Sequence, residues 1–340
     1  MSLQEFYCAV KEQIKKVDFP SLWEGFRPLR FAFYDQDSCC FDGVMIEKTP
    51  DFLGNTAINY RGETIAIWNV MEEIDPTVLA SKLIHEMFHG FQALHHESRF
   101  PNELRALYSY RYNEENLSAK LQENQLLAQL TQSFCAAKFS KLLSLRKYRA
   151  LHFPNEFLYE AKIEQIEGSA NYVELNALKQ LSPALYRQKL SQMCEHIQNP
   201  SNLLPIRIIS YDIGALLLHV IKENNIPLSE DFSDLTFSEV LIENVPALAA
   251  SIDCSIGKAV EEFDSSAKQT IHLALQNNDI LIEKETALLG VNVYNAVYYD
   301  KYIISKHFVM YGDASAPTVS YGDFVIETPH EGIATKIFKI

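Results

Sequence analysis

The hydrophobic pattern of this 340-residue chain changes its period at one point, and that change restricts the fold more than any other feature. Residues 30–69 have the composition of β-strands and end in a near-alternating strand over 63–69, behind a hairpin turn. From residue 76 to about 97, apolar residues recur every three or four positions, which predicts an amphipathic helix. Asp75 suits the N-cap of this helix, and Pro76 suits its first turn. The pattern therefore predicts a mixed α+β chain in which a sheet precedes a long helix.

The rest of the chain has a helical pattern up to residue 278 and a β pattern after it. Helices are predicted over 2–17, 102–150 (broken near Asn113), 156–181, 183–198, 206–224 and 256–277. Short β-type runs follow at 280–282, 291–294, 302–304 and 324–326. We expect a predominantly helical α+β protein in three parts: residues 1–75 with the N-terminal helix and small sheet, 76–278 as a helical body, and 279–340 as a β-rich module.

Composition disfavours some classes of function and of cellular compartment. Lys and Arg number 30 against 44 Asp and Glu, so the net charge of −14 disfavours a nucleic-acid binder, which normally carries a basic face. The six cysteines include no CxxC pair, which fits a reducing compartment. The N-terminal segment resembles an amphipathic helix more than a signal peptide, and no run of 18 apolar residues predicts a membrane span. We expect a soluble, cytoplasmic protein with no membrane or nucleic-acid partner; its oligomeric state stays open.

The helix over 76–97 contains an HExxH motif formed by His85, Glu86 and His89. Residues four apart lie on one face of an α-helix, so both imidazoles can point at one ion. Zn²⁺ accepts imidazole nitrogen, and a catalytic zinc site needs a third protein ligand and an open position for water. Glu86 follows the first ligand, where its carboxylate can take a proton from that water. The motif therefore predicts a zinc site with His85 and His89 as ligands and Glu86 as the base.

A strand-rich segment followed by an HExxH helix resembles the zincin metallopeptidases. The resemblance implies a zincin-like catalytic domain whose edge strand pairs with extended substrate, and the strand over 63–69 would be that edge. The metzincin branch takes its third ligand from HExxHxxGxxH, and His95 stands at that position. Gln92 replaces the glycine that permits the sharp turn, so the helix should continue and carry His95 away from the ion.

A later helix offers the third ligand, because residues 167–170 form the sequence EGSA. This segment resembles the EGxA element of gluzincins. The resemblance implies Glu167 as the third zinc ligand and Asn171 as a group that orients a ligand histidine. Gly168 and Ala170 are small, so we expect this helix to approach the HExxH helix closely. Glu331 begins a second EGxA, but it lies in the β-rich tail, where no helix is expected.

Polar side chains share one side of the helix predicted over 156–181. A stripe of this kind has two interpretations: it lines a site, or it is a solvated helix face. The residues of the stripe are Glu160, Glu164, Glu167, Asn171 and Glu174.

Zincin hydrolases also use a Tyr or His to stabilise the oxyanion of the tetrahedral intermediate. Tyr211 opens the helix over 206–224 and resembles a YxxG element that follows EGxA in similar families. The resemblance therefore implies Tyr211 as the oxyanion-binding residue. Tyr172 and His152 are alternatives for the same role.

These observations predict a zinc-dependent hydrolase of gluzincin type, with Zn²⁺ as cofactor and a peptide or protein as substrate. Two alternatives stay open: a non-catalytic binding protein on a zincin scaffold, and a helical protein without metal. A di-iron carboxylate bundle would need a second ExxH pair on a helix, and the pair formed by Glu327 and His330 contains a proline in the β-rich tail.

Overall fold

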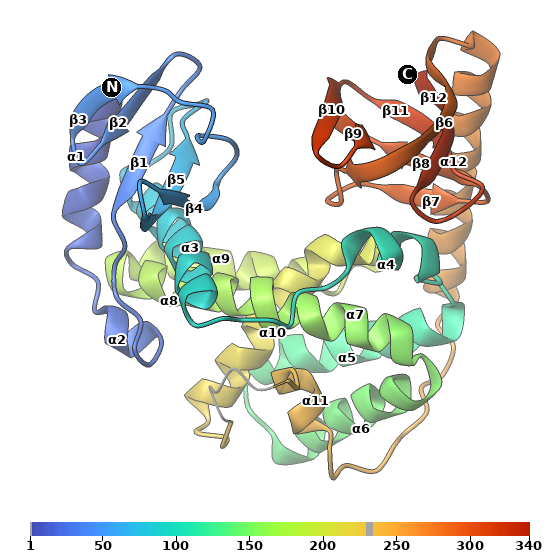
Figure 1. Ribbon diagram of the computed structural model, residues 1–340. Helices are drawn as coiled ribbons and strands as arrows, with labels where there is room; N and C mark the ends of the chain where they lie inside the picture. Colours follow the sequence, from blue (N-terminus) through green and yellow to red (C-terminus); the bar gives the residue numbers. More distant parts are fainter. Residues whose placement is uncertain (1, 229–233) are drawn as a thin grey trace.

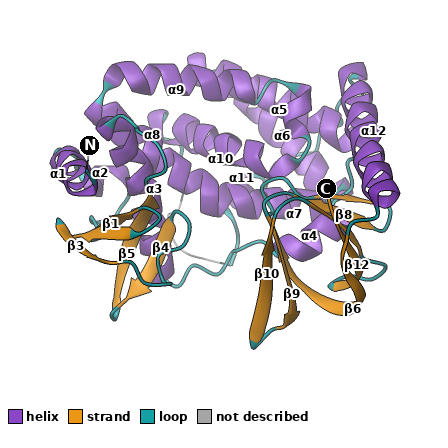
Figure 2. Ribbon diagram, turned by 90° about the horizontal axis from the view of Figure 1, so that it is seen from above, coloured by secondary structure: helices purple, strands orange, loops and turns teal. Residues whose placement is uncertain are grey.

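The computed structural model describes residues 2–228 and 234–340, which form a helical body with a sheet at each end (Figure 1). Figure 2 shows that both sheets stand on the same face of the helical layer. The expected α+β composition is therefore confirmed, and helices hold more residues than strands. None of the described helices is long and apolar enough to cross a membrane.

The N-terminal sheet has five strands in the order β3-β2-β1-β5-β4, and it corrects one expectation. The strand predicted over 63–69 is present as β5, but it lies inside the sheet, because β1 pairs with it in parallel on one side and β4 pairs with it in antiparallel on the other. β4 is therefore the edge strand next to β5, while β3 forms the other edge, and the outer side of β4 pairs with no strand of the described chain. The elements are α1 (Leu3–Ile14), α2 (Phe19–Leu22), β1 (Phe31–Tyr34), β2 (Ser38–Phe41), β3 (Val44–Glu47), β4 (Thr56–Tyr60) and β5 (Glu63–Asn69).

Helix α3 (Pro76–Leu94) begins where the sequence predicts. The side chain of Asp75 accepts hydrogen bonds from the backbone N–H groups of Thr77 and Val78, which satisfies two donors that the first turn leaves unpaired. The helix continues through Gln92, as expected, and His95 is its C-cap. Its apolar side packs against α1, β4, β5 and α8.

The helical body confirms the predicted helices but divides two of them further. The break near Asn113 is confirmed, and a second break at Ser133 separates α5 from α6. The predicted helix over 156–181 is two α-helices joined by a π-helical turn over Glu164–Gly168. The elements are α4 (Glu103–Ser109), α5 (Glu114–Gln132), α6 (Ala136–His152), α7 (Pro154–Ile163), α8 (Ser169–Leu181), α9 (Pro183–His196), a 3-10 turn (Pro200–Leu203), α10 (Ile206–Glu223), α11 (Phe237–Leu241) and α12 (Cys254–Asn277).

Gly168 permits a close helix approach, but to a different helix from the one expected. A Cβ on Gly168 would lie 2.7 Å from the Cα of Gly214 in α10, and a Cβ on Gly214 would lie 2.8 Å from the Cα of Glu164. The glycine of EGxA therefore packs against α10, not against α3. Both glycines are needed because only a residue without Cβ lets two backbones come this close.

Part of the polar stripe is buried, so the solvated-face interpretation is wrong for it. Glu160 and Glu164 are at most 1% exposed, and Lys120 Nζ lies 2.7 Å and 3.1 Å from their carboxylates. Arg146 pairs with Glu164, and Arg149 pairs with Glu160. We call this group the buried charge cluster: Lys120, Glu123, Arg146, Arg149, Glu160 and Glu164.

The C-terminal module is a seven-stranded sheet in the order β10-β9-β6-β12-β11-β8-β7. It packs on α12 and on α4, where the Tyr108 and Thr328 hydroxyls lie 2.6 Å apart. The β-rich tail is therefore confirmed. Its strands are β6 (Ile280–Val291), β7 (Val297–Tyr299), β8 (Tyr302–Ser305), β9 (Phe308–Asp313), β10 (Ala316–Tyr321), β11 (Phe324–Glu327) and β12 (Ile333–Lys339).

Candidate metal centre

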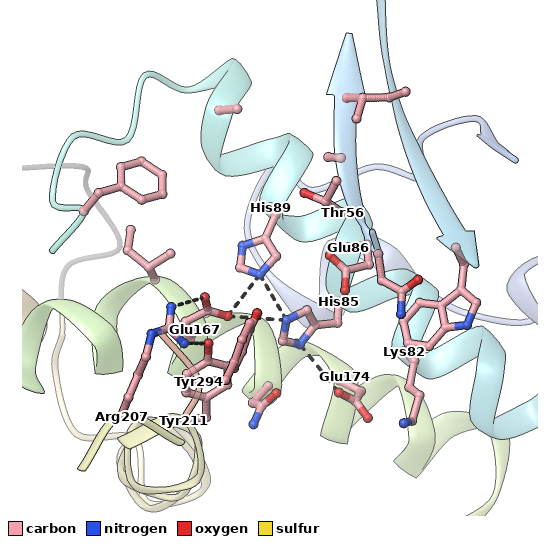
Figure 3. Close-up of a pocket in the computed structure, with 18 of the residues that line it drawn as sticks. Thr56, Lys82, His85, Glu86, His89, Glu167, Glu174, Arg207, Tyr211 and Tyr294 are labelled. Carbon is pink, nitrogen blue, oxygen red and sulfur yellow. Dashed lines mark hydrogen bonds and ion pairs between the residues drawn. The ribbon is translucent and has the colours of Figure 1, made fainter. Parts of the chain in front are cut away.

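Three predicted residues from two distant parts of the chain converge in the structure (Figure 3). The Nε2 atoms of His85 and His89, one turn apart on α3, lie 3.0 Å from each other. Glu167 Oε2, from the π-helical turn, lies 3.3 Å from His89 Nε2 and 3.8 Å from His85 Nε2. One ligand atom from each residue therefore faces a common point, and this trio could hold a metal ion.

The π-helical turn and Arg207 together position Glu167. A π turn contains one residue more than an α turn, which rotates the side chains after it relative to those before it. Glu164 thereby belongs to the buried charge cluster while Glu167 faces α3. Arg207 Nη2 lies 3.4 Å from Oε1 of Glu167, so the second carboxylate oxygen, Oε2, faces the imidazoles.

The surroundings of the trio shift the pKa of Glu167, its one acidic member, and that of the neighbouring Glu86. Burial raises the pKa of Glu167, but the contacts with His85 and His89 outweigh it and hold this pKa far below its usual range. Burial raises the pKa of Glu86, and the nearby carboxylates of Glu167 and Glu174 add to this effect, although the two histidines partly oppose it. A carboxylate with a raised pKa is the better proton acceptor near neutral pH, which suits a general base.

The Nδ1 atoms of the two histidines contact Gln92 and Glu174, two residues to which the sequence motifs assign no role. His89 Nδ1 lies 2.8 Å from Oε1 of Gln92, whose amide nitrogen donates to the backbone oxygen of Ile166. His85 Nδ1 lies 3.5 Å from Oε2 of Glu174. Glu174 lies two helical turns after Glu167 and belongs to the polar stripe of the sequence analysis, so its shared helix face was the available signal for this role.

Asn171 differs from its expected role. Its side-chain amide donates to Oδ1 of Asp212 over 3.4 Å, and Glu174 lies beside His85 instead. Asn171 still lines the cleft described below.

Tyr211 lies beside Arg207, which connects several parts of the site. Arg207 donates to the Tyr211 hydroxyl through Nη1 and to Glu103 Oε1 through Nε, over 3.0 Å in the second case. The hydroxyl of Tyr211 accepts this bond, so its own proton can point into the cleft. Arg207 is 8% exposed, and its charge is balanced by Glu103 and Glu167.

The other candidates for these roles lie elsewhere. Tyr172 is buried, and its ring packs edge-on to Trp23. His152 stacks on Tyr148 at the end of α6. His95 Nδ1 lies 2.9 Å from the backbone oxygen of Phe91, outside the trio, and Glu331 lies in the turn before β12.

A cleft of about 840 Å³ lies over the trio. Its walls include the edge strand β4, helix α3 and the first turns of α8, and the C-terminal module contributes Tyr294. Figure 3 shows the side chain of Tyr294 between Arg207 and His85, and its ring centre lies 4.9 Å from the Arg207 guanidinium carbon. The sequence alone gave no signal for this contact, because Tyr294 lies more than 120 residues from the EGxA segment.

We compared the chain with protein-family models, curated proteins and solved structures, and none of the three comparisons finds a match.

Proposed function

We propose that this protein is a zinc-dependent hydrolase, a gluzincin-like metallopeptidase that cleaves peptide bonds. His85, His89 and Glu167 would hold Zn²⁺, and Glu86 would act as the base. The proposal rests on the geometry of the candidate metal centre and on the resemblance of its two motifs to zincins.

The distances within the trio carry the proposal. Four ligands at about 2.0–2.1 Å around a tetrahedral zinc lie about 3.3 Å from one another. The three ligand atoms here are 3.0, 3.3 and 3.8 Å apart. Two neutral imidazoles and one carboxylate also form a donor set that zinc prefers. A small adjustment of side chains would therefore accommodate the ion.

The chain supplies the remaining groups for hydrolysis. A zinc ion, when bound, lowers the pKa of a coordinated water and polarises the substrate carbonyl. Glu86 lines the cleft beside His85 and His89, so its carboxylate accepts the proton of the attacking water and passes it to the leaving amine. The hydroxyl of Tyr211 donates a hydrogen bond to the developing oxyanion and keeps its proton. The outer side of β4 offers backbone groups to an extended peptide.

The open side of the metal site favours a catalytic protein over a binding protein on the same scaffold. A purely structural metal site would close with a fourth protein ligand. Among the described residues the cluster has three members, and it opens into the cleft.

All six cysteines are free, which supports a reducing compartment such as the cytoplasm.

Metal analysis and peptidase assays on three variants test the proposal. Glu86→Gln should keep one zinc per chain and lose hydrolysis by about 10²–10⁴-fold, because the base is gone while all ligands remain. His85→Ala should lose zinc. His95→Ala is the matched control, since this histidine is the C-cap of the same helix and lies outside the trio, and it should keep both zinc and activity. Wild-type protein without zinc affinity, or full activity in Glu86→Gln, would overturn the proposal.

A further inference from the structure

Among the described residues, one cation of the cleft has no acidic partner within ion-pair distance. Lys82 lies on α3 three residues before His85, and Figure 3 shows it on the opposite side of the trio from Arg207. Its Nζ lies 5.7 Å from the ring centre of Trp68, and no carboxylate oxygen of the described residues lies within the 4.0 Å of an ion pair. The other two cleft cations are paired: Arg207 with Glu103 and Glu167, and Lys189 with Glu174.

The acidic groups near Lys82 have other contacts. Glu86, four residues later on the same helix, is 9% exposed and interacts with both histidines of the trio. Glu174 contacts Lys189 through one oxygen, over 2.5 Å, and His85 through the other. Among the described residues, the Lys82 ammonium therefore has no carboxylate at ion-pair distance, whereas Glu174 is shared between Lys189 and His85.

The structure also leaves room for a ligand at this position. A second hollow of about 410 Å³ adjoins the cleft, and Lys82, Glu174 and Lys189 line both. The indole of Trp68 faces the Lys82 ammonium, an arrangement that stabilises the cation and restricts its position. A partly buried, positioned ammonium at the junction of two hollows attracts an anion more strongly than a solvated surface lysine does.

We propose that Lys82 binds a carboxylate of the substrate close to the scissile bond, in the hollow that Lys189 also lines. This inference rests on the proposed function and specifies its substrate class. Three residues of α-helix rise about 4.5 Å, and an extended peptide advances about 3.3 Å per residue. The carboxylate therefore belongs to a residue one or two positions from the scissile bond. It is either an acidic side chain or the free C-terminus of the peptide.

Binding of two small hydroxamates to the zinc-loaded protein tests the inference without turnover. Acetohydroxamate carries only the metal-binding group, whereas the monohydroxamate of succinic acid adds a carboxylate at a short distance. Calorimetry should show the acidic compound binding at least about tenfold more tightly to the wild type, as a charge-assisted pair predicts. Lys82→Met should remove most of this preference and leave the affinity for acetohydroxamate unchanged. Lys82→Glu should reverse it.

A lysine away from the cleft provides the matched control. Lys258 is exposed on α12, and Lys258→Met should keep the wild-type preference. Equal affinity of the wild type for both hydroxamates would overturn the carboxylate subsite while the metal centre stands. Absence of zinc or of any hydroxamate binding would instead overturn the proposed function.

Two peptide sets then separate the two sources of the carboxylate. One set has an internal Asp or Glu and an amidated C-terminus, and the other has neutral side chains and a free C-terminus. Faster cleavage of the first set relative to neutral amidated peptides identifies an acidic side chain. Faster cleavage of the second identifies the terminal carboxylate, and with it an exopeptidase. The preference should decrease in Lys82→Met in either case; cleavage of both sets at the rate of the neutral amidated peptides would contradict the subsite.

Discussion

Glu174 Oε2 lies 3.5 Å from Nδ1 of His85, the ring nitrogen that faces away from the metal trio. Lys189 holds the other oxygen of Glu174 at 2.5 Å. A carboxylate behind a ligand histidine fixes the orientation of the ring and raises its basicity toward a metal. Burial raises the pKa of Glu174, but Lys189 and His85 outweigh it and lower this pKa to about 2, so the carboxylate is ionised at neutral pH.

Glu174→Gln should therefore weaken zinc binding by about 10–100-fold. The amide keeps the size of the side chain but removes the negative charge behind His85. Competition with a chromophoric chelator measures the zinc affinity. Asn171→Ala is the matched comparison, because Asn171 lies on the same helix face and contacts Asp212. An equal loss of affinity in both variants would show that Glu174 has no special role.

Gly214→Ala should lower the free energy of unfolding by about 1–3 kcal/mol, as overpacking of a close contact does. The new Cβ would lie 2.8 Å from backbone atoms of Glu164 and would push the π-helical turn away from α10. Urea unfolding measures the change. Gly257→Ala on α12 is the control: its Cβ would meet only Glu114 at 3.5 Å, so it should stabilise the helix by about 0.5–1 kcal/mol. Equal stability of Gly214→Ala and wild type would mean that the close approach is not required.

The free energy of unfolding should fall as the pH drops from about 4.5 to 2. Burial raises the pKa of Glu164, but Arg146 and Lys120 outweigh it and lower this pKa from 4.5 to about 2; the pKa of Glu160 is lowered in the same direction. A carboxyl group with a lower pKa in the folded state adds stability above its unfolded pKa and loses it as the pH falls through the folded pKa. Urea titrations at a series of pH values measure the slope.

The variant Glu164→Gln isolates this contribution. Burial raises the pKa of Glu123 in the same cluster, and this shift opposes the effect of Glu164 and Glu160. The pH dependence of the wild-type free energy of unfolding is therefore the sum of opposing contributions. Glu164→Gln leaves Lys120 and Arg146 short of one negative charge and should cost about 3–5 kcal/mol at neutral pH. Its stability should also depend less on pH below 4.5 than that of the wild type. If the free energy of unfolding of Glu164→Gln depends on pH as strongly as that of the wild type, other groups cause the acid sensitivity.

Tyr211→Phe should lower kcat by about 10²-fold and leave zinc content and KM nearly unchanged, because the oxyanion forms only in the transition state. Peptidase kinetics measure kcat and KM, and metal analysis on the same samples measures the zinc content. Tyr186→Phe, on α9 outside the cleft, should behave as wild type. If Tyr294→Phe carries the loss instead, the C-terminal module supplies the donor, since its ring lies in the same cleft beside Arg207.

Local patterns predicted the parts of this molecule that depend on near neighbours in sequence. Asp75 and the apolar period set the start of α3, and four-residue spacing on one helix brings His85 and His89 together. Glu167 was found through its motif and its helical position. The structure supplied the role of Glu174, because its contact with His85 depends on how α8 lies against α3.

The sequence by itself determined the element types and three metal-site candidates, because periodicity, caps and helix spacing act within a few residues. Only the tertiary structure decided which strand forms the sheet edge, where the polar stripe is buried and which residues face the cleft. These features depend on pairing across the sheet and packing between helices: β1 occupies one side of β5, Gly168 meets Gly214, and Tyr294 arrives from the C-terminal module. Such contacts join residues far apart in the chain, and no local pattern records which of the available partners a residue will meet.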